Sequence, residues 1–416
     1  MNTVSNLKKV LALNSKINST LDIDELLGII MTTASEVMRA EAASLMLLEE
    51  ESKELVFRVA LGEKGSELKE KFRVKLGEGV AGWVAQSGEP LIVNDPRTDK
   101  RFAGRFDDAT GFQSKAIICV PMHAQNKIIG ILEALNPVGR PVFSEDDLEL
   151  FQAFADQAAI SVENARLHQA LVQQELATRE LKIAREIQQS FLPDLKELAL
   201  SLDLSCRNIP AREVSGDFYD VIRLDGAKTG IMIGDVSGKG VPASLYMVRA
   251  ISDSRFLAPR NSNPANLLTE LNNRLARDSR FGIFTTLLYL VVDAQDKSIQ
   301  YASAGHHPII RRQASSGALE ALKGDSGMPL GLFENAEYAL NVFKADKGDT
   351  FFLYTDGITE ARNAAGEEFE LTRLKQAVAE PAQNSQAYAD RIFHALKEFT
   401  RGAEQHDDIT LVALTT

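Results

Sequence analysis

The chain has 416 residues, so about two or three domains are expected. Hydrophobic residues make up 44% and charged residues 25%, which excludes a wholly disordered or collagen-like chain. With 46 basic and 58 acidic residues, the net charge of −12 disfavours nucleic acid and anionic membranes as partners. Cys119 and Cys206 lack a metal-binding spacing, and no apolar run approaches the ~18 residues of a membrane span. We therefore expect a cytoplasmic protein without a signal peptide.

The N-terminal part of the chain alternates helical and strand patterns. Residues 4–19 carry a helical stripe of apolar side chains. Asp22, followed three residues later by Glu25, predicts the start of a helix that ends near Met38. Strands are predicted after it at 43–48, 54–60, 90–93, 116–122 and 127–135.

A long helix is predicted next, because Ser144 and Asp147 form a capping box and Pro193 is the first helix breaker after them. Positions at heptad spacing form two seams that are out of phase, at Ile160, Leu167 and Leu171 and then at Leu176, Ile183, Ile187 and Ser190, and all but Ser190 are apolar. A lone helix of this length gains little stability in water, which favours a parallel dimeric coiled coil over a solvated rigid spacer.

Beyond Pro193 the pattern is one of strands and glycine-rich turns. Strands are predicted at 201–208, 218–224, 228–236, 285–293, 298–304, 308–312, 350–355 and 409–414. Helices are predicted at 242–257, 264–278 and 385–400.

Four acidic residues in this half each adjoin an apolar strand: Asp217, Asp235, Asp356 and Asp407. Carboxylates that converge repel one another unless cations neutralise them. Oxygen ligands without a convergent His or Cys suit hard ions such as Mg²⁺ or Mn²⁺. Two such ions would balance four carboxylates, which would remove the electrostatic objection to a phosphorylated substrate.

The segments around these acids resemble the metal-dependent protein phosphatases of the type two C (PPM) superfamily, in its SpoIIE-like and RsbU-like bacterial branch. The matching segments are 184–193 (AREIQQSFLP), 213–220 (EVSGDFYD), 234–243 (GDVSGKGVPA), 304–306 (AGH), 328–331 (MPLG), 354–361 (YTDGITEA) and 407–410 (DDIT). The resemblance implies an α/β sandwich of two mainly antiparallel sheets flanked by helices.

It also implies two Mn²⁺ or Mg²⁺ ions per domain. Asp235 would bridge them, Asp217 and the backbone carbonyl of Val236 would complete one shell, and Asp356 and Asp407 would hold the other ion. Water between the ions would attack phosphorus directly. Their neighbours Asp220 and Asp408 rank lower as ligands, although Asp408 could instead orient water.

The proton donor for the leaving group is an open question. Eukaryotic relatives have a proposed general acid, a histidine, where this chain has Ser237. His306 is a speculative substitute, and a structural role is favoured for it. Lys239 lies between two glycines but lacks the spacing of a nucleotide-binding loop.

Residues 22–165 resemble a GAF domain, a sensor module for small ligands or protein interactions. The matching segments are 77–84 (GEGVAGWV), 93–102 (VNDPRTDKRF), 118–122 (ICVPM), 130–136 (GILEALN) and 143–147 (FSEDD). The resemblance specifies a fold but no ligand. A small molecule, a protein ligand and an empty pocket that serves only dimerisation all stay open. Asn136 is followed by Pro137, which departs from the pattern of cyclic-nucleotide-binding members.

Together these patterns predict a multidomain α+β protein. Residues 1–160 would be a GAF domain with an antiparallel sheet and an N-terminal helix, 161–192 a helical coiled-coil linker, and 193–416 a PPM-type domain. The protein would be a homodimeric serine/threonine phosphatase that its GAF domain regulates through the linker. Its substrate would be a phosphorylated STAS-type anti-sigma-factor antagonist, so its output would be partner switching in bacterial transcription.

The sequence is also compared with the requirements of two other functions. A catalytically silent signalling scaffold is the alternative, and the four acidic ligand positions argue against it. A cyclic-nucleotide phosphodiesterase would need clustered histidines, and the six of this chain are scattered.

Overall fold

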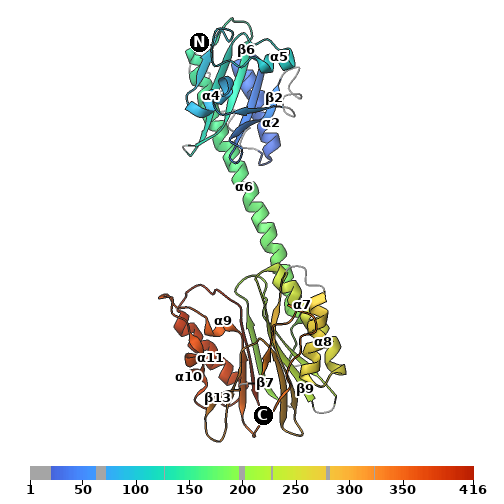
Figure 1. Cartoon of the computed structure of the whole chain (residues 1–416). Coiled ribbons are helices and arrows are strands. Elements are labelled where there is room, and N and C mark those ends of the chain that lie inside the picture. Colours follow the sequence, from blue (N-terminus) through green and yellow to red (C-terminus); the bar gives the residue numbers. More distant parts are fainter. Residues whose placement is uncertain are drawn as a thin grey trace. The chain divides into compact units, whose positions relative to one another are not determined.

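A computed structural model of the chain (Figure 1) describes residues 20–61, 72–125, 127–195, 202–225, 228–277, 282–322 and 324–416. The helix predicted at 4–19 lies outside these residues. The chain divides into two compact units, Met1–Leu176 and Ala177–Thr416, which are described separately below. Over the described residues, no helix combines the length and the apolar character that crossing a membrane requires.

The first unit is built on an antiparallel six-stranded sheet in the order β3-β2-β1-β6-β5-β4. Its strands are β1 (Ala40–Glu49), β2 (Glu54–Leu61), β3 (Arg73–Lys75), β4 (Leu91–Val93), β5 (Ile117–Ala124) and β6 (Lys127–Pro137). Leu45 and Leu47 of β1 face one hydrophobic core, and Met46 between them faces another. This alternation arises because successive side chains of a strand point to opposite faces. With both faces covered, the strands are nearly continuous apolar runs.

The helices of this unit cover the two faces of the sheet. Helix α2 (Ile23–Met38) and the first turns of α6 (Glu145–Phe191) pack on one face, and α4 (Gly79–Ser87) packs on the other. A short α5 (Arg105–Thr110) follows β4. The predicted start of α2 is confirmed, since the Asp22 side chain accepts a hydrogen bond from the Glu25 backbone N–H at 2.9 Å.

Helix α6 is one continuous 47-residue helix, and it crosses the boundary between the two units. The predicted capping box begins it: the Ser144 N–H donates to the Asp147 carboxylate at 2.8 Å. Residues such as Phe151, Ala158 and Val162 are buried in the first unit. The predicted seam residues are instead exposed over 48–59% of their surface: Ile160, Leu167, Leu171, Leu176, Ile183 and Ile187. A coiled-coil seam would look like this in a single chain, and its pairing stays a prediction.

The second unit contains two sheets. The first has the order β14-β11-β10-β9-β8, with β15 paired to β11, and the second has the order β13-β12-β16-β17-β7. The strands of the first are β8 (Phe218–Arg223), β9 (Lys228–Val236), β10 (Thr285–Asp293), β11 (Ser298–Ala304), β14 (Ser326–Gly327) and β15 (Asn341–Lys344). Those of the second are β7 (Asp203–Ile209), β12 (Ile309–Arg312), β13 (Leu319–Leu322), β16 (Thr350–Tyr354) and β17 (Ile409–Thr415).

The two sheets pack face to face on a shared core that includes Ile231, Leu290, Phe351 and Val412. Helices α7 (Val241–Leu257) and α8 (Pro264–Arg277) cover the outer face of the first sheet, and a 3₁₀ turn (Ala258–Arg260) follows α7. Helices α10 (Glu370–Val378) and α11 (Ser385–Thr400) cover the second, and a short α9 (Asp356–Thr359) follows β16 (Figure 1). The predicted fold, a sandwich of mainly antiparallel sheets flanked by helices, is confirmed.

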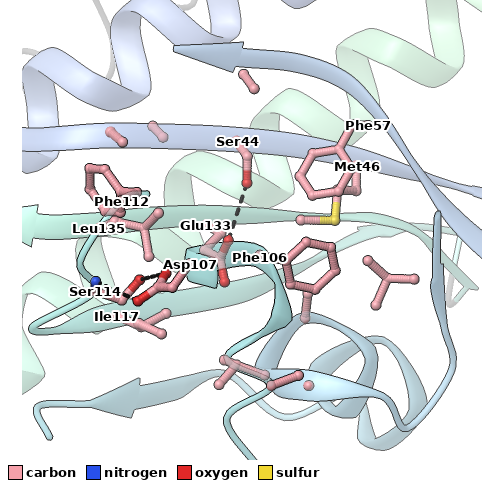
Figure 2. A pocket seen from close by; sticks show the side chains of 18 of the residues that line it. Ser44, Met46, Phe57, Phe106, Asp107, Phe112, Ser114, Ile117, Glu133 and Leu135 are labelled. Carbon is pink, nitrogen blue, oxygen red and sulfur yellow. Dashed lines mark hydrogen bonds between the residues drawn. The ribbon is translucent and has the colours of Figure 1, made fainter. Parts of the chain in front are cut away.

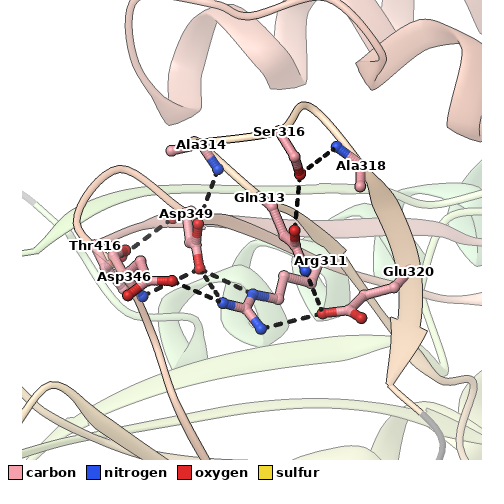
Figure 3. Close-up of polar contacts among 9 residues, drawn as sticks. All are labelled: Arg311, Gln313, Ala314, Ser316, Ala318, Glu320, Asp346, Asp349 and Thr416. Atoms are coloured by element: carbon pink, nitrogen blue, oxygen red, sulfur yellow. Dashed lines mark hydrogen bonds and ion pairs between the residues drawn. The ribbon is translucent and has the colours of Figure 1, made fainter.

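A buried ion pair joins the second sheet to the end of the chain. The Arg311 guanidinium on β12 donates from Nε to Asp349 at 2.9 Å, and Asp349 also accepts from the backbone N–H groups of Ala314 and Asp346 (Figure 3). Asp349 is fully buried, and its own backbone N–H and C=O pair with Asp346 and Thr416. One carboxylate therefore holds the turn before β16 and the turn after β12 together.

Replacing Asp349 with alanine should destabilise the second unit by about 3 kcal/mol, because the largely buried Arg311 would keep only Glu320 as a close partner and the N–H groups of Ala314 and Asp346 would lose their acceptor. The matched control is Asp346→Ala. Its side chain is 82% exposed and lies 3.7 Å from Arg311, so its loss should cost less than about 1 kcal/mol. Urea unfolding followed by circular dichroism would measure both changes, and equal shifts for the two variants would contradict this account.

Candidate active site

Strand pairing brings the four predicted acids to one end of the sandwich. Asp217 directly precedes β8, Asp235 is near the end of β9, and the register pairs Phe218 with Gly234, so the two acids are neighbours across this strand pair. In the other sheet, Asp356 follows β16 and Asp407 lies just before β17. These two strands are also paired and antiparallel. Each sheet thus contributes two carboxylates at its rim.

Two glycines allow the acid-bearing loops to approach each other. A Cβ atom on Gly357 would lie 1.9 Å from the Asp408 carbonyl oxygen, and one on Gly216 would lie 3.0 Å from the Val236 carbonyl oxygen. Any side chain at position 357 would push Asp356 away from the Asp407 loop. The glycine that follows Asp356 is therefore required by this close approach of the two loops.

Asp217 is the most deeply buried of the four, with 2% of its surface exposed. Its Oδ2 accepts a hydrogen bond from Thr355 Oγ1 at 2.6 Å, and Thr355 Oγ1 in turn accepts from the Thr410 N–H at 3.0 Å. Burial, and then the charge of Asp235, raises the pKa of Asp217 well above its usual range. The two threonines thus position a carboxyl of one sheet from the other sheet.

The remaining acids also act on one another. Burial, followed by the charges of Asp356 and Asp407, raises the pKa of Asp235 to about 7, and a hydrogen bond with Asp217 opposes this shift. Burial and Asp407 raise the pKa of Asp356. The four predicted residues therefore form one electrostatic cluster.

Little positive charge balances this cluster. Lys239 Nζ donates to Asp407 Oδ2 at 3.0 Å and to the His406 carbonyl at 2.7 Å. In the part of the chain that the structure describes, no three His, Cys, Asp or Glu side chains are gathered closely enough to hold an ion as they stand. The donors are all oxygens and carry excess negative charge, which fits hard divalent cations. The Val236 carbonyl oxygen, the fifth predicted ligand, lies close to Gly216 and hence beside Asp217.

The lower-ranked acids have partners of their own. Asp408 accepts hydrogen bonds from Ala211 N–H, Gly216 N–H and Ser215 Oγ at 2.7–2.8 Å. It therefore fixes the loop that carries Asp217. Asp220 is fully buried and forms two hydrogen bonds with the Arg255 guanidinium, at 2.7 and 2.9 Å.

The two histidines differ in their surroundings. His306 is buried, its Nδ1 pairs with Thr286 Oγ1 at 2.8 Å, and burial lowers its pKa to about 3. It is therefore neutral near pH 7, which suits the favoured structural role. His307 is exposed and stacks on Tyr354, and in its protonated form it would oppose the rise in the pKa of Asp356 that burial and Asp407 cause. The sequence pattern does not predict this place for His307, although it shows the adjacent pair of histidines.

A contact from the long helix was also missed. Gln188, near the end of α6, is buried and pairs with Ser215 in both directions: its Nε2 donates to the Ser215 carbonyl at 2.7 Å, and its Oε1 accepts from the Ser215 N–H at 3.0 Å. The same Nε2 lies 3.7 Å from Met247 Sδ on α7. Ser215 is two residues from Asp217, so α6 holds the loop of a candidate ligand. The segment 184–193, which resembles the PPM phosphatases, contains Gln188 but does not identify its partner.

A cavity of about 530 Å³ adjoins the acid cluster at Asp407. Its apolar lining includes Phe393 and Leu396 of α11. Basic side chains line it at Arg207, Lys239, Arg362 and Lys397, together with the acids Glu360, Glu404 and Asp407. A groove with this lining offers both apolar contact and positive charge next to the cluster.

Comparison with known proteins agrees with this architecture. Residues 225–416 match the family described as stage II sporulation protein E (SpoIIE), and residues 22–162 match the GAF domain family. The chain is 30% identical over 252 residues to phosphoserine phosphatase RsbU of Bacillus subtilis, which covers 59% of this chain and 73% of that protein. It is also 30% identical over 266 residues to protein IcfG of Synechocystis, which covers 56% of this chain and 41% of that protein.

A solved structure supports the fold of the second unit. The SiaA-PP2C domain of Pseudomonas aeruginosa matches 59% of this chain and 99% of its own length, with 23% identity and a TM-score of 0.53. At this identity the match concerns the fold alone. From the family matches and the RsbU alignment, the chain belongs to the SpoIIE-type family of PPM phosphatases that includes RsbU, and it carries a GAF domain ahead of its phosphatase domain.

Proposed function

We propose that the C-terminal domain removes phosphate from a phosphoserine or phosphothreonine of a protein, with two Mn²⁺ or Mg²⁺ ions held by Asp217, Asp235, the Val236 carbonyl, Asp356 and Asp407. The observation that carries this proposal is the convergence of four interacting carboxylates from two sheets with Lys239 as their cationic contact. The domain boundaries that we propose remain those expected from the sequence: GAF at 1–160, linker at 161–192 and phosphatase at 193–416.

When bound, the ions would supply an activated water and screen the charge of the phosphate. The residues of the chain would position them. Asp408 fixes the 211–216 loop, Thr355 holds the Asp217 carboxyl, and Lys239 holds Asp407. Ser237 stands where eukaryotic relatives have the proposed general-acid histidine, and His306 is neutral near pH 7. Neither residue therefore supplies a protonated histidine for the leaving group.

We propose as substrate a phosphorylated STAS-domain protein, which would place the enzyme in the partner switching that controls sigma factors. RsbU, the aligned relative, is named as a phosphoserine phosphatase. We expect the cavity beside Asp407, which basic and apolar side chains line, to receive the segment of the substrate that carries the phosphate.

Regulation would run through α6. Its seam residues are exposed in the single chain, which supports a homodimer formed through the GAF domain and the linker helix. Its end is bonded to Ser215 and touches Met247 of α7. A change in the register of paired α6 helices would therefore alter the position of Asp217 and of α7, as a shift between two states of similar free energy.

The first test is hydrolysis of a phosphorylated STAS protein by the full chain with and without Mn²⁺. Asp235→Asn should lower the rate at least about 100-fold, because a bridging ligand is lost. The same variant should melt no lower than the unaltered chain without metal, since one repelling charge is gone. Mn²⁺ should raise the melting temperature of the unaltered chain and have little effect on the variant.

Asp225→Asn is the charge-matched control, because Asp225 is exposed and lies outside the cluster. It should retain both activity and stabilisation by Mn²⁺. If the unaltered chain binds the phosphoprotein but releases no phosphate with Mn²⁺ or with Mg²⁺, a catalytically silent scaffold replaces the enzyme as the better account.

Gln188→Leu should raise the Mn²⁺ concentration needed for half-maximal activity by about 10-fold or more, because a misplaced ligand loop binds metal less well. Leucine keeps the apolar volume near Met247 but leaves the Ser215 N–H and C=O without their partner. Gln189→Leu, at the exposed neighbouring position, is the control. An unchanged metal requirement in Gln188→Leu would refute a role for this contact.

The double substitution Leu167→Arg with Leu171→Arg should convert a dimer to a monomer in analytical ultracentrifugation, since two charges would face each other across the seam. Gln173→Arg changes an exposed residue between the two seams and should leave the dimer intact. A dimer that survives the double substitution would show that α6 is not its main contact.

A further inference from the structure

The first unit contains a cavity of about 450 Å³ that the phosphatase chemistry does not use. It lies against strands β1 and β6 and the segment around α5 (Figure 2). Its walls are largely apolar, with Met46, Phe57, Phe106, Phe112, Ile117 and Leu135. Its volume lies within the range of roughly 300–1,000 Å³ that is usual for small-molecule pockets.

The charged side chains among the described residues that line this cavity are all acidic: Glu41, Glu78, Asp107 and Glu133. Three of them have close partners in the protein. Glu41 accepts from Asn136 Nδ2 at 2.8 Å, Glu78 pairs with Arg105 at 3.0 Å, and Asp107 accepts from the N–H and Oγ of Ser114 at 2.8 and 2.7 Å.

Glu133 differs from these three. Its partner is the Ser44 hydroxyl, at the longer distance of 3.3 Å, and its carboxyl points into the middle of the cavity between Asp107 and the ring of Phe106 (Figure 2). Burial raises its pKa to about 7, and the charge of Asp107 adds to this effect. A carboxylate surrounded by apolar walls and a second carboxylate is poorly stabilised unless a cation or a strong hydrogen-bond donor meets it.

We infer that this cavity binds a small organic ammonium ion, with its charged nitrogen against Glu133 and its apolar body among Met46, Phe57 and Phe106. The carboxylate supplies a charge-assisted hydrogen bond, and the aromatic rings add attraction for a cation. The cavity belongs to the GAF domain, so ligand binding there can be tested independently of the phosphatase activity.

The same lining disfavours anions. A cyclic nucleotide or a carboxylate would bring negative charge beside Glu133 and Asp107, and among the described residues no Lys, Arg or His lines the cavity. A bare metal ion is also disfavoured, because Glu41, Glu78 and Asp107 are bonded to other side chains and most of the remaining wall is apolar. An organic cation would pair its charge with the carboxylate and place its hydrocarbon part against the apolar walls.

Isothermal titration of the full chain at pH 7.5 with three probes that share an indole ring tests this inference. The probes are tryptamine (cationic), tryptophol (neutral) and indole-3-acetate (anionic), with cyclic AMP as a second anion. Tryptamine should bind at least about 10-fold more tightly than tryptophol, and neither anion should bind measurably.

Glu133→Gln should weaken tryptamine binding by about 10–100-fold and leave tryptophol binding nearly unchanged, because the amide keeps the shape of the side chain but loses its charge. Glu36→Gln removes the same charge from an exposed position of α2 and should change nothing. Tighter binding of an anion, equal binding of the amine and the alcohol, or no binding of tryptamine at millimolar concentration would overturn the inference. These three comparisons use the unaltered chain, so they hold even where Glu133→Gln fails to fold.

Discussion

The mutual repulsion of carboxylates held at the facing ends of two sheets is the constraint on which the second unit depends. Asp217 and Asp235 are fixed by adjacent strands of one sheet, and Asp356 and Asp407 by adjacent strands of the other. The strands cannot separate to relieve the repulsion, because their inner faces share the core around Ile231 and Phe351. The fold therefore concentrates unfavourable negative charge at a defined place, and the divalent cations that we propose would neutralise it.

The support around Asp217 has a different character from the core. Its loop is held by polar contacts: Asp408 through three hydrogen bonds, Thr355 through one and Gln188 through two at Ser215. Hydrogen bonds depend on distance and angle more steeply than apolar burial does. A small movement of α6 or α7 would thus affect the Asp217 carboxyl before it affected the sandwich, which agrees with the proposed regulation through α6.

The sequence predicted the features that depend on local pattern. The long strands at 228–236, 285–293 and 298–304, the capping of α2 and α6, and the four acids at strand ends all carry such patterns. The short edge strands β13, β14 and β15 carried too few residues for alternation to show. Helix α10 was missed although Leu371, Leu374 and Val378 form a helical stripe. The partner of Gln188 and the Arg311–Asp349 pair could not be predicted, because these contacts join residues distant in the chain that only the folded structure brings together.

Each unit contains carboxyl groups that its own fold leaves without sufficient counter-charge, yet the expected partners differ. In the phosphatase domain several oxygens converge, so they can replace the hydration shell of a hard ion. In the GAF cavity the Glu133 carboxylate has the Ser44 hydroxyl at 3.3 Å as its partner, and rings and aliphatic side chains line much of the wall around it. One oxygen pair cannot dehydrate a metal ion, but it can bind an ammonium group whose apolar remainder replaces water against those walls. The number of converging oxygens, rather than the sign of the charge, would therefore distinguish the proposed metal site from the proposed amine site.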